Sequence, residues 1–222
     1  IGRLSAGVAH EIRTPLTSLK LFLESVENEI AISPEYEEDF RIAMKQVKRM
    51  EATISRFLDF AKPQDPVFSR LDVGELIEDA LLVVGPKARQ QETLIQKSIS
   101  RRLPKVKGDR KQLGEALLNL MVNGLEAVSS QGEVQITVDP VELELGGRLQ
   151  PCVRIDVRDT GPGIAEENMN KLFDPFFTTK ATGAGLGLSI VYSTIQRHGG
   201  EVMVQSAVGK GTTFSMLVPA DV

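Results

Sequence analysis

The sequence lacks a disulfide framework, because Cys152 is the only cysteine among its 222 residues. A single cysteine cannot form an internal disulfide, and it fits a reducing compartment. No apolar run approaches the roughly 18 residues that a membrane-spanning helix requires, and no segment resembles a signal peptide. A basic excess is also missing, since the net charge of −4 argues against a nucleic-acid partner. We therefore expect a cytoplasmic protein with no nucleic-acid partner and no direct membrane contact.

The chain also lacks an initiating methionine and opens on Ile1 in a helical pattern. We expect a piece of a longer protein, and membrane anchoring of that parent stays open. Hydrophobic residues at 41% and charged residues at 25% are ordinary for a folded globular protein. The length suffices for one large domain or two modest ones.

Glycine and proline are scarce in residues 1–62, which contain two of each. Apolar residues recur there at alternating spacings of four and three, the heptad pattern of helices that pack along their length. The break at Ser33-Pro34 separates two series, with Ser33 as the expected N-cap and Pro34 as the first helical residue. The series are Ile12, Leu16, Leu19, Leu23, Val26 and Ile30, then Tyr36, Phe40, Ala43, Val47, Met50, Ile54, Phe57 and Ala61. The pattern predicts an antiparallel helical hairpin. Because two helices bury little, we expect a homodimer in which residues 1–62 of two copies form a four-helix bundle.

The periodicity changes after Pro63 and Pro66, which mark an expected linker. Helix and strand patterns then mix without strict alternation, which predicts an α/β sandwich with about three helices on one face of a mixed sheet. The expected helices run from an Asp72 cap to about Gln91, from Gly108-Asp109 to about Val128, and over 186–197. The expected strands are 93–99, two around 134–138 and 153–157 joined by a turn at Gly146-Gly147, then 201–206 and 212–218. The fold class is therefore multidomain, α plus α/β, with domains at 1–66 and 67–222.

Two glycine-rich segments are candidates for a phosphate site. RDTGPGI (158–164) follows an apolar strand, and TGAGLGLSIV (182–191) leads into a helix. Glycine lets the backbone approach a ligand closely, and exposed amides at a helix start bind phosphate; alternatively, each segment is only a turn. The G-x-G-x-G spacing does not fit a Rossmann fingerprint, and no P-loop sequence occurs. A nucleotide at these segments therefore requires another fold.

Two asparagines interrupt the leucine-rich helix ALLNLMVNGLEAV (116–128). Asn119 and Asn123 are four residues apart and share one helix face, although asparagine is unfavourable inside a helix. Their amide oxygens suit a hard cation such as Mg²⁺, which takes its remaining ligands from water and phosphates. The alternative is a solvated helix flank.

Five segments, in order along the chain, resemble the motifs of sensor histidine kinases. AHEIRTPL, NLMVNGLEA, DTGPG, LFDPFFTTK and GAGLGLSI are similar to the phosphoacceptor, asparagine, first glycine, phenylalanine and second glycine motifs of that family. The terminal GKGTTF (209–214) also fits the last strand of its ATP domain. The resemblance implies a dimerisation and histidine phosphotransfer hairpin, then a catalytic ATP-binding domain of the kind shared with gyrase, the Hsp90 chaperones and MutL. It implies ATP and Mg²⁺ as ligands and a response regulator receiver domain as a partner.

The resemblance also implies roles for residues of this sequence. Asp159 would bind the adenine amino group, Asn123 would ligate Mg²⁺, and Asn119 would lie close to the phosphates. The other implied residues are Gly161 and Gly163 beside the adenine, Gly183, Gly185 and Gly187 over the triphosphate, Lys180 at the phosphates, Thr212 on the adenine side, and Phe173, Phe176 and Phe177 in a mobile lid.

Two positions depart from the patterns of this family and its relatives. Gly124 stands where many members have alanine, which costs a little helix propensity. In ATP-hydrolysing relatives, a glutamate four residues before the metal-binding asparagine activates water. Asn119 occupies that place here and cannot act as a base, which favours transfer to a protein side chain. A register that pairs Glu115 with Asn119 would leave Asn123 unexplained and would break the match at Glu126-Ala127.

His10 is the expected nucleophile. It lies two residues from both Val8 and Ile12, about 200° round the helix from each, so we expect it to point away from the seam. A zinc-protease H-E-x-x-H is excluded because Thr14 takes the place of the second histidine. Glu11 would accept the proton from the other ring nitrogen. Thr14 matches the place where such kinases position water to dephosphorylate the regulator, so we expect a bifunctional kinase and phosphatase.

Two other functions stay open at this point. A related ATPase, chaperone-like or mismatch-repair-like, would use nucleotide-driven dimer closure without phosphotransfer, and a scaffold would carry a degenerate ATP site. The heptad hairpin and Asn119 argue against the first, whereas Asp159, Asn123 and the glycines argue against the second. Steady ATP turnover without protein labelling would support the ATPase.

Overall fold

The computed structural model describes residues 2–29, 32–61, 64–128, 131–145, 148–180 and 183–221, without the side chains of residues 2–11, 28–29, 56, 59–61, 145 and 148. The chain divides into two compact units, Ile1–Asp65 and Pro66–Val222. The turn expected at Gly146-Gly147 lies outside the described residues. Within the described ranges, no helix is both long and apolar enough to span a bilayer.

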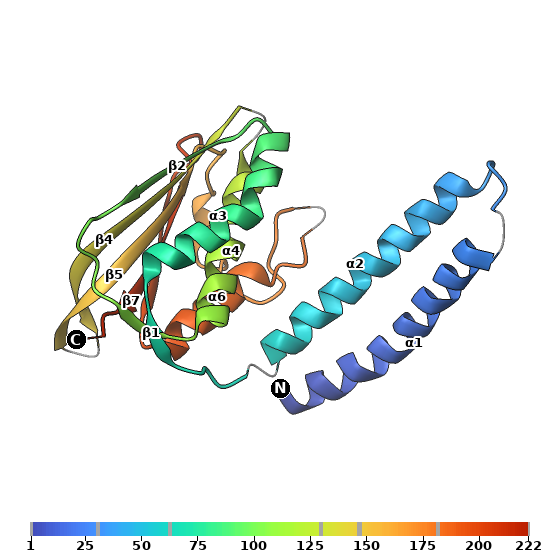
Figure 1. The fold of residues 1–222 in the computed structure, drawn as a ribbon, viewed down its shortest axis with the longest axis horizontal. Helices are drawn as coiled ribbons and strands as arrows, with labels where there is room; N and C mark the ends of the chain where they lie inside the picture. The colour runs from blue at the N-terminus through green and yellow to red at the C-terminus, as the bar shows by residue number, and fades with distance from the viewer. Residues whose placement is uncertain are drawn as a thin grey trace. The chain divides into compact units, whose positions relative to one another are not determined.

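The first unit is an antiparallel hairpin of α1 (Gly2–Glu29) and α2 (Glu37–Ala61) (Figure 1). Where the two helices pack, Leu16 of α1 and Met44 and Val47 of α2 are buried. The ammonium of Lys20 lies 3.0 Å from a carboxylate oxygen of Glu51 across the same contact. The hairpin predicted from the heptad spacing is therefore confirmed.

The start of α2 differs from the prediction. Residues 34–36 form a turn in which the N–H of Tyr36 donates to the carbonyl of Ser33 at 2.8 Å, and the helix begins only at Glu37. Ser33 is therefore not the N-cap, and Pro34 is not the first helical residue. An acidic first turn, favourable at the positive end of the helix dipole, stands in place of the predicted cap.

Part of the predicted seam stays exposed in a single hairpin. Ile12, Leu19 and Met50 keep 48%, 44% and 46% of their surface accessible. Ala43 is exposed, whereas Met44, which the heptad series omitted, is buried. One hairpin gives each helix one neighbour, so only one side of each apolar stripe is covered.

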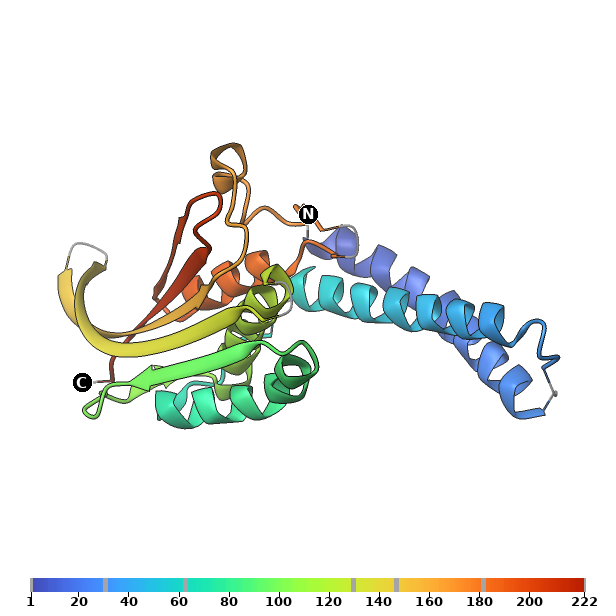
Figure 2. The same cartoon turned by 90° about the horizontal axis from the view of Figure 1, so that it is seen from above.

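The second unit contains a five-stranded sheet of order β2-β4-β5-β7-β6. The pairing of β2 with β4 is parallel and the other pairings are antiparallel, so the sheet is mixed, as predicted. The long β4–β5 hairpin curves strongly (Figure 2). The strands are β2 (Leu94–Ile99), β4 (Glu133–Leu145), β5 (Arg148–Asp159), β6 (Glu201–Ser206) and β7 (Thr212–Pro219), and a separate two-stranded sheet pairs β1 (Ser69–Leu71) with β3 (Val106–Gly108).

Three helices cover one face of this sheet (Figure 1). They are α3 (Val73–Gln90), α4 (Arg110–Ala127) and α6 (Gly187–Arg197), and α5 (Glu166–Met169) is a single turn. Helix α4 packs against both α3 and α6, and its leucines at 113, 117 and 120 are at most 2% exposed. The predicted α/β sandwich is confirmed, with α4 at the centre of its helical layer.

Aspartates fix the starts of α3 and α4, as their sequence positions predicted. Asp72 accepts a hydrogen bond of 2.8 Å from the N–H of Gly74, and Asp109 accepts one of 3.0 Å from the N–H of Gln112. Each bond satisfies an amide that the helix itself leaves unpaired. Because the start of α4 is fixed, the direction in which Asn119 and Asn123 leave the helix is fixed as well.

Candidate functional site

Helix α4 brings the two asparagines to the start of α6. Both side chains are half-buried. A Cβ placed on Gly187 would lie 3.5 Å from Asn119 Oδ1 and 3.8 Å from Asn123 Nδ2, so α6 begins directly against them. Leu186, which precedes α6, offers no side-chain cap to the first amides of the helix. These amides and the asparagines together form a site suited to phosphate oxygens.

Asp159 ends β5 and is 4% exposed. Its carboxylate accepts a hydrogen bond of 2.8 Å from the N–H of Gly161 and another from the backbone of Thr212. Burial raises the pKa of Asp159 above its ordinary value, although these two bonds and the charge of Lys180 oppose the rise. A buried carboxylate held by backbone amides is a specific acceptor for a ligand N–H group.

The first glycine motif joins Asp159 to the end of α4. A Cβ on Gly161 would lie 2.8 Å from both the carbonyl oxygen of Ala127 and Asp159 Oδ1. Gly163 has a φ of 73°, and a Cβ there would lie 2.1 Å from the carbonyl oxygen of Ala207. The segment therefore requires glycine at both positions.

The second glycine motif contacts the phenylalanine segment. Gly185 has a φ of 67°, and its carbonyl accepts a hydrogen bond of 2.9 Å from the N–H of Phe176. A Cβ on Gly183 would lie 2.8 Å from the hydroxyl oxygen of Thr178. The segment expected to form a lid is thus hydrogen-bonded to the start of α6.

The three phenylalanines of that segment have different surroundings. The ring of Phe173 lies 5.3 Å from that of Tyr192 and packs against the core. Phe176 is 57% exposed, and Phe177 is half-buried. Phe173 therefore holds the segment to the domain, whereas Phe176 faces solvent.

Lys180 reaches back to α4. Its ammonium lies 2.8 Å from Glu126 Oε2 and 3.3 Å from Asn123 Oδ1, and Lys87 lies 3.2 Å from Glu126 Oε1. Burial alone would raise the pKa of Glu126, but the hydrogen bonds and charges of the two lysines hold it below its ordinary value. We did not predict Glu126 as a site residue, although its position three residues after Asn123 places both on one helix face.

The last strand, β7, begins beside Asp159. The hydroxyls of Thr212 and Ser206 lie 2.9 Å apart. Gly211, which we did not predict, has a φ of 81°, and a Cβ there would lie 2.0 Å from the carbonyl oxygen of Asp159. The sequence feature that could have identified Gly211 is its position immediately before Thr212.

The expected phosphoacceptor segment lies within α1. The side chains of His10 and Glu11 are outside the described residues. Thr14 is exposed, and its carbonyl accepts a hydrogen bond of 3.2 Å from the hydroxyl of Ser18.

The residues of the candidate site fit Mg²⁺. Among the described residues, no group of three or more His, Cys, Asp or Glu side chains could hold a metal ion. Mg²⁺ does not need such a cage, because it is usually bound by one or two protein oxygens, several waters and substrate phosphates. Asn123 Oδ1 could serve as a hard oxygen ligand, and the Nδ2 of the same side chain lies 3.8 Å from the Cβ position of Gly187 at the start of α6.

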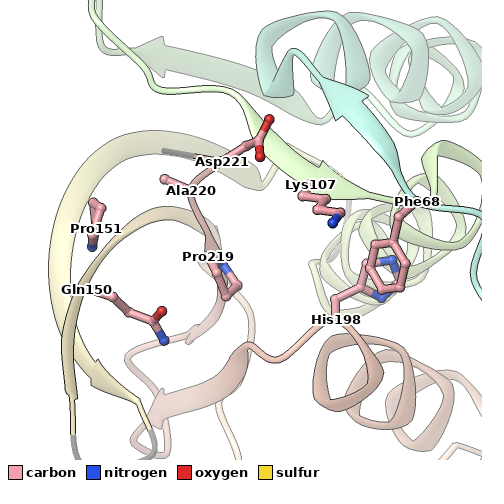
Figure 3. A pocket seen from close by; sticks show the side chains of 8 residues that line it. All are labelled: Phe68, Lys107, Gln150, Pro151, His198, Pro219, Ala220 and Asp221. Atoms are coloured by element: carbon pink, nitrogen blue, oxygen red, sulfur yellow. The ribbon is translucent and has the colours of Figure 1, made fainter.

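A hollow of about 530 Å³ lies at the opposite end of β7 from Thr212 (Figure 3). Buried His198 in its wall is fully hydrogen-bonded: Nδ1 donates to the carbonyl of Thr194 at 2.7 Å, and Nε2 accepts from the N–H of Asp109 at 3.0 Å. The ring thus supports the start of α4 and has no nitrogen left for catalysis. The lining residues are Phe68, Lys107, Gln150, Pro151, His198, Pro219, Ala220 and Asp221.

Two family models match the chain. Residues 1–66 match the His Kinase A (phospho-acceptor) domain, and residues 108–222 match the histidine kinase-, DNA gyrase B-, and HSP90-like ATPase. Sensor histidine kinase ZraS of Escherichia coli (strain K12) is 33% identical over 222 residues, which are 100% of this chain and 46% of ZraS. The chain therefore spans less than half the length of this curated relative.

Solved structures of histidine kinases are similar over nearly the whole chain. Full-length ShkA in complex with AMPPNP gives a TM-score of 0.84 at 25% identity, covering 99% of this chain and 46% of that one. Histidine kinase ThkA in complex with response regulator protein TrrA gives 0.69 at 28% identity, covering 99% and 61%. With both family models matched, the chain belongs to the sensor histidine kinases of two-component systems.

Proposed function

We propose that this chain transfers the γ-phosphoryl group of ATP to His10 and then to an aspartate of a response regulator. The observation that carries the proposal is the meeting of three motifs at α4: the asparagines, the buried Asp159 and the uncapped start of α6. Residues 67–222 would bind the nucleotide, and residues 1–66 would dimerise and carry the phosphoacceptor. The ThkA complex with TrrA supports a response regulator as the partner.

The nucleotide would be held from both ends. Asp159 would accept a hydrogen bond from the adenine amino group, with Gly161, Gly163 and Thr212 around the base. Asn119 and Lys180 would contact the phosphates, and Gly183, Gly185 and Gly187 would close over them. Asn123 would bind Mg²⁺, which supplies neutralisation of phosphate charge when bound. Catalysis by such a site is mainly positioning and electrostatic stabilisation.

The transfer step would use two residues of α1. One imidazole nitrogen of His10 forms a bond to the γ-phosphorus while the bond to the bridging oxygen breaks and ADP leaves. Glu11 accepts the proton from the other ring nitrogen, so the product is a neutral ring carrying a phosphoryl group. With Asn119 in the place of a general base, no side chain there activates water for hydrolysis.

Labelling with radioactive ATP tests the kinase. We expect an acid-labile, alkali-stable phosphate on the chain that is lost in His10→Gln, because no other imidazole takes the phosphoryl group. Asn123→Ala should lose the label together with Mg²⁺-dependent nucleotide binding. Label that persists in His10→Gln would refute the assignment, and steady ATP turnover without any label would favour the dimer-closure ATPase.

We also propose that Thr14 positions water to dephosphorylate the regulator. Thr14 is exposed on α1, as attack on a docked partner requires. Thr14→Ala should lose at least about ten-fold in regulator dephosphorylation while His10 labelling continues. Ser18→Ala, one turn along the helix, is the matched control. Equal dephosphorylation by Thr14→Ala and the parent chain would rule out the phosphatase role.

A further inference from the structure

The ammonium of Lys180 contacts Asn123 Oδ1, the oxygen that we propose as the magnesium ligand. The nitrogen and the oxygen lie 3.3 Å apart, within hydrogen-bonding distance. The proposed magnesium ligand is thus capped by a cation that the protein itself provides. The cap comes from the segment between α5 and α6, which is also bonded to the start of α6 through Phe176 and Gly185.

Glu126 holds the ammonium in this place. The 2.8 Å contact of Lys180 with Glu126 Oε2 is shorter than its contact with Asn123, and it joins opposite charges. Glu126 and Asn123 lie on one face of α4, so a single ammonium reaches both. Lys87 of α3 binds the other carboxylate oxygen at 3.2 Å, which fixes the orientation of Glu126.

An ammonium and a divalent cation exclude each other at one amide oxygen. Mg²⁺ binds its ligands at about 2.1 Å, and a lysine ammonium at hydrogen-bond distance from the same oxygen would be strongly repelled. Binding of Mg²⁺ at Asn123 Oδ1 would therefore displace the ammonium of Lys180. The released ammonium is then free to pair with phosphate oxygens.

We propose that Glu126 is a positioning residue that latches Lys180 over Asn123 until magnesium nucleotide displaces it. The proposal rests on the proposed ATP site. In this arrangement the lid lysine changes partners, from Glu126 and Asn123 to the phosphates, as the metal arrives. Glu126 therefore sets the Mg²⁺ concentration at which the site binds magnesium nucleotide.

A titration with Mg²⁺ at a fixed concentration of a fluorescent ATP analogue tests the latch on the full chain. Glu126→Gln keeps the shape of the side chain and removes its charge. Because this half-exposed pair contributes little more than an ordinary surface ion pair, we expect the half-saturating Mg²⁺ concentration to fall about two- to five-fold. An unchanged or increased Mg²⁺ requirement would overturn the latch.

A second background separates the latch from a simple change of charge. In Lys180→Met the ammonium is absent, so a further Glu126→Gln change should leave the Mg²⁺ requirement as it is. The same fall in both backgrounds would overturn the latch, since the effect would then not need Lys180. Absence of nucleotide binding by the parent chain would instead overturn the proposed ATP site.

Hydrogen exchange without nucleotide gives an independent readout. The backbone amides of residues 176–180 and 183–186 should exchange faster in Glu126→Gln and in Lys180→Met, with no additional gain in the double variant. Equal protection in the parent chain and both variants would mean that Glu126 does not hold the segment. Thermal unfolding confirms that each variant is folded, as expected for half-exposed side chains.

Discussion

The carboxylate of Asp159 is held in a place that disfavours its charge. It is almost fully buried, and burial raises its pKa despite the amide donors that favour the ionised form. A raised pKa means that the protonated form fits the folded chain better. The contribution of Asp159 to stability is thus full below the ordinary value of 3.8 and is lost as pH rises through the raised value.

Asp159→Asn should separate stability from function. The amide keeps an acceptor oxygen for Gly161 without a buried charge, so the free energy of unfolding should match or exceed that of the parent at about pH 8. Urea denaturation should show this difference shrinking as pH falls through the raised pKa of Asp159, because the parent carboxyl then becomes protonated. ATP affinity should fall roughly ten- to a hundred-fold, because a charged hydrogen bond to the base is lost. If Asp159→Asn instead loses stability relative to the parent as pH rises, the direction given for the pKa shift of Asp159 is wrong.

At the scale of elements, α4 is the platform on which the site is assembled, and Gly124 lies in its last turn. A Cβ at this position would make ordinary contacts, 3.5 Å from the Val134 methyls and 3.7 Å from Asp159 Cβ. Gly124→Ala should therefore raise the free energy of unfolding by about 0.5–1 kcal/mol through helix propensity. Urea denaturation measures the change, and nucleotide affinity should stay within about two-fold.

Gly161→Ala is the contrasting variant. Its Cβ would lie 2.8 Å from the carbonyl oxygen of Ala127, which belongs to the backbone and cannot turn aside. It should lower both stability and nucleotide affinity. If Gly124→Ala also destabilises the chain, the packing between α4 and β4 is tighter than these distances indicate.

The elements differ in how far the sequence predicted them. Repetition made the long helices and the central strands predictable, because apolar residues mark the buried face in every turn or every second residue. β1, β3 and α5 contain three or four residues each, too few to show a period. The cap at Ser33 failed because a turn can use the serine carbonyl instead of its hydroxyl.

The site was predictable for a different reason. Glycine takes a positive φ without strain and lets the backbone approach a ligand closely, and asparagine is unfavourable inside a helix, so Gly163, Gly185 and Asn123 were candidates from the sequence. Glu126 looked like any exposed helix residue. Its role depends on Lys180, which is 54 residues away in the chain and reaches it only through the fold.

At the scale of the whole molecule, the exposed seam of the hairpin indicates a second copy. Ile12, Leu19 and Met50 are each close to half exposed, and a partner hairpin would cover them in a four-helix bundle. Leu19→Glu should dissociate this dimer, because an unpaired carboxylate in the bundle centre costs several kcal/mol. Sedimentation equilibrium should then give the mass of one chain, whereas the parent chain gives that of two.

Leu21→Glu provides the matched control for this dimer. Leu21 is 60% exposed and carries the same substitution on the same helix, but it lies about 200° away from Leu19. It should leave the dimer intact, and both variants should retain ATP binding, because the nucleotide site belongs to the other unit. Dissociation by both variants would mean that added charge, and not the seam, breaks the dimer. A parent chain that sediments as a monomer would remove the second copy from the proposal, and the exposed apolar side of the hairpin would then need another partner.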